Sequence, residues 1–244
     1  KFKGASLIEY GLNKNLENTF SKILKFALKK AKYQIRLYLR RYDVANIKTI
    51  LRGKFSKVSN VRIFNELIAS GEFSREFLES VVESSTNVDE AVESFNKTDY
   101  YSIIKKFASD LTKLEDELDK FYYTNVLQHA EKELKDYIQL EIFVKNTQNK
   151  LRAKKVNIKV DVIPGERHEK IQFPYHEDSI ESRIFLKKLL IERAIKMVYA
   201  FKRNIRPVLG YFVAKENEVN NLRLLTRGRH AELKEEMIEK QLVI

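Results

Sequence analysis

Three stretches of this 244-residue chain repeat one short pattern, and the repetition restricts the fold more than any other feature. YDVANIKTILRGK at 42–54 resembles VNNLRLLTRGR at 219–229, and EIFVKNTQNKLRAKK at 141–155 is a third copy. When the copies are aligned on Arg52, Arg152 and Arg227, each has an asparagine six residues earlier. Three copies of one helix-and-loop unit predict three similar lobes.

The spacing of the copies is uneven, since they lie 100 and then 75 residues apart. This spacing argues against a tight solenoid, and we expect a closed, pseudo-threefold arrangement of three similar helical lobes over 1–60, 61–160 and 161–244. An echo, LIASGE at 67–72 and DVIPGE at 161–166, follows the first two copies. Because the sequence starts at Lys1 without Met, we expect part of the first lobe to be missing.

The chain is predicted to be all-α. Seven Gly and three Pro are few for a turn-rich β architecture, and apolar residues recur at helical spacing, as at Leu16, Phe20 and Leu24. Residues 155–178 read as a loop or a short hairpin, in which NIKVDV alternates like a strand. We expect helices over 6–41, broken once, and then over 61–68, 74–82, 88–95 and 99–107. The longest helical region is expected over 110–151, with a bend near Thr124 or Tyr137, and the last over 179–240 with a break at 204–207.

Helix ends are predicted from capping residues. Ser74 and Asn87 precede helical patterns as N-caps, and Asp43 is placed to cap a helix over 44–52. Gly53 stands where a helix commonly ends in a left-handed residue.

Charge is distributed in blocks that the net charge of +12 conceals. Residues 22–62 contain thirteen Lys and Arg and one acid, whereas residues 63–141 contain eight against eighteen Asp and Glu. Residues 142–244 are basic again. Blocks of opposite sign favour several partner surfaces, or lobes that face each other, over one uniform nucleic-acid groove.

Catalytic and cofactor motifs are weak throughout. RGKFS at 52–56 lacks the spacing and the Ser or Thr after Lys that a P-loop needs, and the four histidines do not have metal-ligand spacing. The sequence has no Cys, and its longest apolar run is far shorter than the roughly 20 residues of a membrane span. We expect no enzyme, no cofactor, no metal site and no membrane-spanning segment.

The sequence resembles the C subunit of archaeal A-type and bacterial V-type ATP synthases, whose counterpart in eukaryotic vacuolar ATPases is the d subunit. The resemblance covers nearly the whole chain and departs from the family mainly in length. It is carried by LIEYGLNKNLENTFSKILKF (7–26), YLRRYDVANIKTILRGKF (38–55), IASGEFSREFL (68–78), LDKFYY (118–123) and PVLGYFVAKENEVNNLRLLTRGR (207–229).

The resemblance implies a funnel-like arrangement of the three lobes and a mechanical role without catalysis. A member of this family is expected as one copy on the cytoplasmic side of the membrane, bound to the integral rotor ring. It would hold the foot of the shaft, subunits D and F, and couple ATP synthesis or hydrolysis to proton or sodium transport. A helical nucleic-acid-binding protein and a generic scaffold remain the alternatives, because the basic segment and the repeat also allow them.

Partner contacts are predicted at basic residues of the repeats, whose three helices we expect to line the funnel. Asn46, Asn146 and Asn221 form a binding ring with the three aligned arginines, or satisfy buried backbone groups while the arginines cap helices. Six helical residues turn the chain about 240°, so the asparagines and arginines do not share a face, which favours the structural reading. Candidate partner-binding residues are Arg40, Arg41, Lys48, Arg52, Lys54, Arg152, Lys154, Arg223, Arg227 and Arg229.

Overall fold

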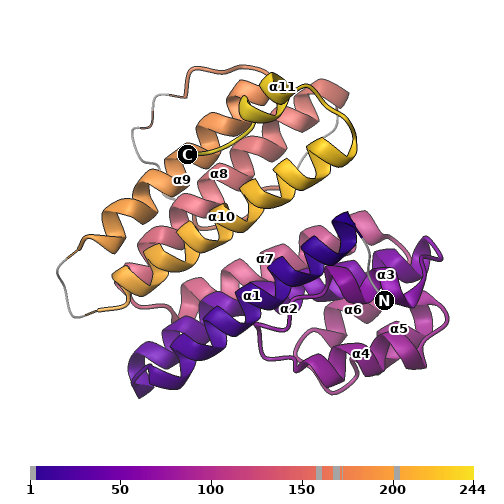
Figure 1. Ribbon diagram of the computed structural model, residues 1–244. Helices are drawn as coiled ribbons and strands as arrows, with labels where there is room; N and C mark the ends of the chain where they lie inside the picture. The colour runs from indigo at the N-terminus through magenta and orange to yellow at the C-terminus, as the bar shows by residue number, and fades with distance from the viewer. Residues whose placement is uncertain (1–3, 158–160, 167–170, 172, 201–203) are drawn as a thin grey trace. The chain divides into compact units, whose positions relative to one another are not determined.

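The computed structural model describes residues 4–157, 161–166, 171, 173–200 and 204–244. Within these residues all regular structure is helical, so the all-α prediction is confirmed (Figure 1). The chain divides into two compact units, Lys1–Tyr122 and Tyr123–Ile244. The funnel-like arrangement of three lobes stays a prediction. Of the predicted NIKVDV strand, residues 158–160 lie outside the described residues, as does His168.

The first unit contains two long helices, four short ones and the start of a seventh. The break predicted once within 6–41 falls at Ala27 and Leu28, and all four predicted short helices are present. Its helices are α1 (Ala5–Phe26), α2 (Lys29–Phe55), α3 (Asn60–Glu66), α4 (Arg75–Ser84), α5 (Val88–Ser94), α6 (Tyr101–Phe107) and the first part of α7 (Leu111–His129).

Helix α2 forms the core of the first unit. Tyr38 and Ile47 are fully buried along it, and Phe20 of α1 packs against Tyr42 with ring centroids 5.7 Å apart. The short helices begin at the predicted caps, since Ser74 Oγ accepts from Phe77 N and Asn87 Oδ1 accepts from Glu90 N.

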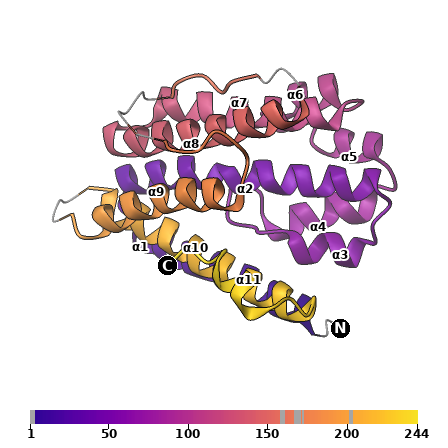
Figure 2. The same cartoon turned by 90° about the horizontal axis from the view of Figure 1, so that it is seen from above.

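The second unit contains the end of α7 and four further helices, three long and one short, which are labelled in Figures 1 and 2. They are α8 (Lys132–Val156), α9 (Ile180–Val198), α10 (Arg206–His230) and α11 (Glu235–Glu239). The helical region predicted over 110–151 is interrupted at 130–131, between the predicted bend positions. Gly210 lets α10 approach α9 closely, because a Cβ atom there would lie 2.5 Å from the Ala194 carbonyl oxygen. The predicted break at 204–207 falls between α9 and α10, and Pro207 lies in the first turn of α10.

Two of the predicted caps are wrong. Helix α2 runs through Asp43 without interruption, and the Asp43 carboxylate accepts from Glu72 N at 2.9 Å and Phe73 N at 3.0 Å. Gly53 lies inside α2, and the left-handed residue is Lys57, with φ of 53°. In both places the residue has a tertiary role that the local pattern does not reveal.

Candidate partner-binding surfaces

The three repeat asparagines make the same contact. Each carboxamide pairs with both backbone groups of one later residue, accepting from its N–H and donating to its carbonyl. Asn46 pairs with Ile68 at 2.9 Å in both directions, and Asn146 pairs with Ile163 at the same two distances. Asn221 pairs with Val243 at 2.8 and 3.3 Å. The structural reading of the asparagines is therefore confirmed.

Copies one and three also share the turn that follows the helix. Val58 N donates to Gly53 O at 2.8 Å, and Leu233 N donates to Gly228 O at 2.9 Å. Lys57 and Glu232, each four residues after the glycine, both have φ of 53°. In both copies a Cβ on the glycine would lie 2.6 Å from an isoleucine Cδ1, of Ile63 or Ile238. The sequence repeat is thus a repeat of local structure.

The echo after copies one and two marks the segment that the asparagine holds. Ile68 of LIASGE and Ile163 of DVIPGE are the paired residues. Glu166 also accepts from Asn146 Nδ2 at 2.7 Å. The echo in the sequence therefore marks the extended segment whose backbone groups are hydrogen-bonded by the helix asparagine.

Two of the candidate basic residues join α2 to α7 inside the first unit. Lys48 Nζ lies 2.5 Å from Asp119 Oδ1, and both side chains are 15% exposed. Arg52 makes a two-point contact with the Glu115 carboxylate. Lys48 and Arg52 are four residues apart on one helix, as are Glu115 and Asp119 on the other. Both cations therefore have carboxylate partners within the chain.

Arg40 and Arg41 point to different neighbours. Arg40 donates to Asp99 Oδ2 at 2.9 Å. The Arg41 guanidinium lies 3.8 Å from the centre of the Tyr38 ring and donates to Tyr122 Oη at 3.2 Å. Both arginines stabilise the unit internally, since guanidinium groups over aromatic faces and next to carboxylates are held in place.

Lys54 is buried, with 7% exposure, and its ammonium group is surrounded by oxygens. It donates to Val82 O and Ser85 O at 2.6 Å and to Asn60 Oδ1 at 2.9 Å. Burial lowers the pKa of Lys54. Its role is to satisfy carbonyls at the C-terminal end of α4 rather than to face a partner.

Candidate residues of the second unit are more open. Arg152 and Lys154 are exposed near the end of α8, and Lys154 Nζ lies 3.4 Å from His176 O. Arg227 and Arg229 are exposed in the last turn of α10, where Arg229 lies 3.9 Å from Glu235. Arg223 donates to Asn220 Oδ1 at 3.2 Å. The exposed basic residues of copies two and three are thus accessible to a partner.

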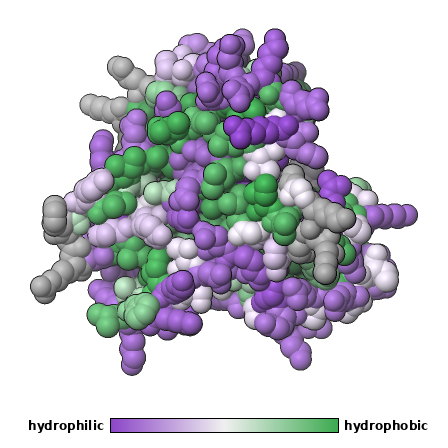
Figure 3. All heavy atoms as spheres, viewed as in Figure 1, coloured by the Kyte–Doolittle hydropathy of each residue, from purple (hydrophilic) through white to green (hydrophobic). Residues whose placement is uncertain are grey.

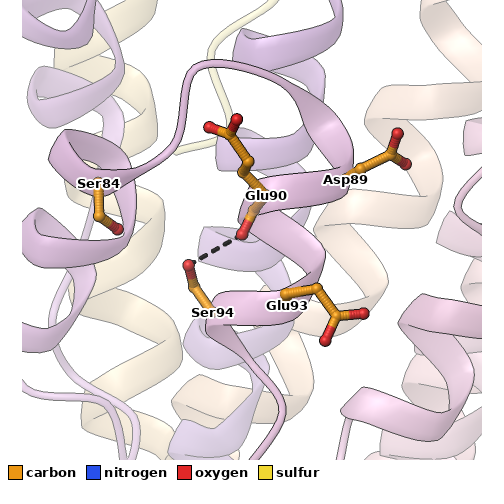
Figure 4. A pocket seen from close by; sticks show the side chains of 5 residues that line it. All are labelled: Ser84, Asp89, Glu90, Glu93 and Ser94. Carbon is orange, nitrogen blue, oxygen red and sulfur yellow. Dashed lines mark hydrogen bonds between the residues drawn. The ribbon is translucent and has the colours of Figure 1, made fainter.

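A shallow acidic hollow between α4 and α5 is a feature that the sequence did not predict. Ser84, Asp89, Glu90, Glu93 and Ser94 line it, and Ser94 Oγ donates to Glu90 O at 3.0 Å (Figure 4). Hydrogen bonds from Thr86 lower the pKa of Glu90, and those from Tyr101 and Lys105 lower the pKa of Glu93. Carboxylates held ionised in this way are poorly suited to general acid chemistry.

Among the residues described by the structure, no group of three or more His, Asp or Glu side chains is placed to hold a metal ion. No helix in the described part of the chain is both long and apolar enough to cross a bilayer.

Comparison with known proteins identifies the family. Residues 1–171 match the family model described as ATP synthase (C/AC39) subunit. The chain belongs to this family. Relatives named as the C subunit of the A-type ATP synthase cover the whole chain: that of Methanococcoides burtonii is 32% identical, with 80% of its own length aligned, and that of Archaeoglobus fulgidus is 31% identical, with 82% aligned.

Membership of the C/AC39 family answers the question of catalysis, and the alignment with a relative answers the question of length. The family is a non-catalytic stalk subunit of a rotary ATP synthase, so the chain is not an enzyme by itself. The alignment with the Methanococcoides relative spans 286 positions against 244 residues here, so this C/AC39 member lacks segments present in that relative.

Proposed function

We propose that this protein couples the central shaft, subunits D and F, to the membrane rotor ring of an A-type ATP synthase. One copy would sit on the cytoplasmic side of the ring and transmit torque between ATP chemistry and proton or sodium transport. Two observations support the proposal. The first is family membership, and the second is a unit that occurs three times, in which a helix asparagine is hydrogen-bonded to the backbone of a later segment.

These asparagine-to-backbone hydrogen bonds suit a protein that transmits force. Each repeat ties an extended segment to a helix through two hydrogen bonds on one carboxamide, and Asn46 and Asn146 are at most 2% exposed. Buried, fully paired polar contacts hold one arrangement, because shifting the segment would leave both of its backbone groups unpaired. A protein that transmits torque needs this resistance to deformation.

Four cations of the basic segment weaken the nucleic-acid alternative, because each is already held inside the chain. Within the basic segment 22–62, Arg40, Lys48 and Arg52 each contact a carboxylate of the acidic segment that follows. Lys54 is buried among oxygens. A nucleic-acid groove requires cations that can neutralise phosphates, and these four already have partners inside the chain.

The accessible basic residues of copies two and three are the proposed partner contacts. The test compares two charge reversals, Arg152→Glu with Lys154→Glu and Arg227→Glu with Arg229→Glu. The control is Lys187→Glu with Lys188→Glu, two exposed lysines on α9 outside the candidate set. Affinity for purified subunits D and F, and separately for the rotor ring, should fall by about tenfold in at least one candidate pair.

Two results would count against this assignment. Equal binding by both candidate pairs and the control would remove these residues from the interface. Tight RNA binding that weakens steeply with salt, together with no binding to D, F or the ring, would favour the nucleic-acid alternative.

A further inference from the structure

The turn between α1 and α2 exposes large apolar side chains. We call residues 22–33 the hairpin tip; it lies at the end of α1 away from the N label in Figure 1. Phe26 and Leu28 are 88% and 81% exposed, and Tyr33 is 48% exposed. Ala27 and Leu28 are extended, and no side chain caps the start of α2. A turn of this kind normally favours small polar residues, so the apolar pair indicates a partner.

The same tip is strongly basic. It contains Lys22, Lys25, Lys29, Lys30 and Lys32, and the sequence has no acidic residue between Glu17 and Asp43. Figure 3 colours the face seen in Figure 1 by hydropathy, and both hydrophobic and hydrophilic residues are exposed on it. Further along α2, Lys48 and Arg52 contact carboxylates of α7.

We propose that the hairpin tip binds the surface of an anionic lipid bilayer. Two apolar side chains at the apex can enter the boundary between headgroups and acyl chains, while lysines on long stems reach the phosphates. Clustered lysines add affinity for anionic lipid, about fivefold for each one near the surface. The five lysines of the tip favour a surface that carries many negative charges, as an anionic bilayer does, over a pocket for the apolar pair alone.

This contact is separate from the coupling role proposed above. Binding to lipid needs neither the shaft nor the ring, so vesicles free of other proteins test it alone. Failure of shaft binding would leave the lipid proposal standing, and the reverse also holds.

The absence of tryptophan from the sequence makes a direct probe possible. Phe26→Trp places a single indole at the apex, and Phe55→Trp places one at the other end of α2, where Phe55 is 68% exposed. Both full-length variants are mixed with vesicles of phosphatidylcholine containing about a third phosphatidylserine, and with vesicles of phosphatidylcholine alone. Emission from the Phe26→Trp variant should shift to the blue only with the anionic vesicles, and emission from the Phe55→Trp variant should stay unchanged.

Flotation with the same vesicles measures the contribution of charge. One triple variant combines Lys25→Gln, Lys29→Gln and Lys30→Gln. It should bind about a hundredfold more weakly than the unsubstituted chain, because the loss of each lysine weakens binding about fivefold. The control, Lys187→Gln, Lys188→Gln, Lys196→Gln, removes the same charge from exposed positions on α9 and should bind within about threefold of the unsubstituted chain. Circular dichroism confirms that each variant is folded.

Three results would overturn the proposal. The first is a blue shift from the Phe55→Trp variant equal to that from the Phe26→Trp variant. The second is equal loss of binding in the two triple variants, which would mean net charge alone. The third is a shift of the Phe26→Trp emission with detergent-purified rotor ring but not with anionic vesicles, which would assign the tip to a protein contact.

Discussion

The Asn46 carboxamide pairs with both backbone groups of Ile68, each at 2.9 Å, and the Asn146 carboxamide does the same with Ile163. A side-chain amide here replaces the neighbouring strand that an extended segment would otherwise need. The relationship recurs at Asn221 and Val243 and explains why the asparagine recurs in every copy.

Replacing these asparagines by alanine should destabilise the unit that contains them, but not equally. Asn46→Ala and Asn146→Ala leave two buried backbone groups unpaired and should cost about 2–4 kcal/mol. Asn221→Ala should cost less, because Asn217 Nδ2 also donates to Val243 O, at 2.7 Å. Hydrogen exchange at the amides of Ile68, Ile163 and Val243 measures each effect locally. Equal protection of Ile68 in the unsubstituted chain and in Asn46→Ala would contradict this explanation.

Two glycines should respond differently to alanine. Gly210→Ala brings a Cβ against the Ala194 carbonyl and the Val198 backbone N, which cannot move aside, so we expect about 2–4 kcal/mol of destabilisation. Gly53→Ala meets the buried side chain of Ile63, whose Cδ1 and Cγ1 would each lie 2.6 Å from the new Cβ. A side chain can shift more easily than backbone, and copy two already has Ala153 at this place, so the loss should be smaller, about 1–2 kcal/mol. Urea unfolding compares the two variants, and a larger loss in Gly53→Ala would be inconsistent with the close α9–α10 contact.

Asp43 should make the first unit less stable as pH rises. Burial raises its pKa from 3.8 to about 6, although hydrogen bonds from Glu72 and Phe73 act in the opposite direction. The folded state therefore binds the proton more tightly than the unfolded state, and stability present below about pH 4 is lost as pH rises through 6. Between pH 4 and 7 the free energy of unfolding of the unsubstituted chain should fall by about 1–3 kcal/mol more than that of Asp43→Asn.

The control for this pH dependence is Asp89→Asn, at an exposed position of the same unit. Its free energy of unfolding should follow the unsubstituted chain across the whole range. Parallel curves for the unsubstituted chain and Asp43→Asn would show that Asp43 does not titrate in this window.

Lys54→Met should be strongly destabilising despite keeping an apolar stem. The substitution removes the ammonium group from Val82 O and Ser85 O, and buried carbonyls without a donor cost about 1–3 kcal/mol each. The matched variant Lys97→Met, at an exposed position, should change stability by less than about 0.5 kcal/mol. Thermal unfolding followed by circular dichroism distinguishes them, and similar melting temperatures would rule out the carbonyl-binding role.

The helical fold and the repeat are accessible to sequence reasoning because both depend on local periodicity. Asp43 is misread as a cap, since an acid before an apolar run has the same local appearance whether the helix starts there or continues. Here the buried face of α2 extends from Tyr38 through Tyr42 to Asn46, so the helix continues and the carboxylate serves a distant loop.

The candidate basic residues show the same limit. Lys48, Arg52 and Lys54 stand out in the sequence as cations of one repeat, but their partners Asp119, Glu115 and Ser85 lie 31 to 71 residues further along the chain. Which cations remain available to another protein depends on this tertiary pairing. The sequence pattern alone therefore overestimates the partner-binding surface of copy one.

The most direct test of the coupling role is assembly of this chain with its two proposed partners at once. The full chain is mixed with subunits D and F and with detergent-purified rotor ring at about 0.3 M salt, where screening suppresses nonspecific charge binding. Size-exclusion chromatography with light scattering should show one complex containing all partners and a single copy of this chain, and omitting the chain should separate shaft from ring. Shaft and ring that associate equally well without it would contradict the account.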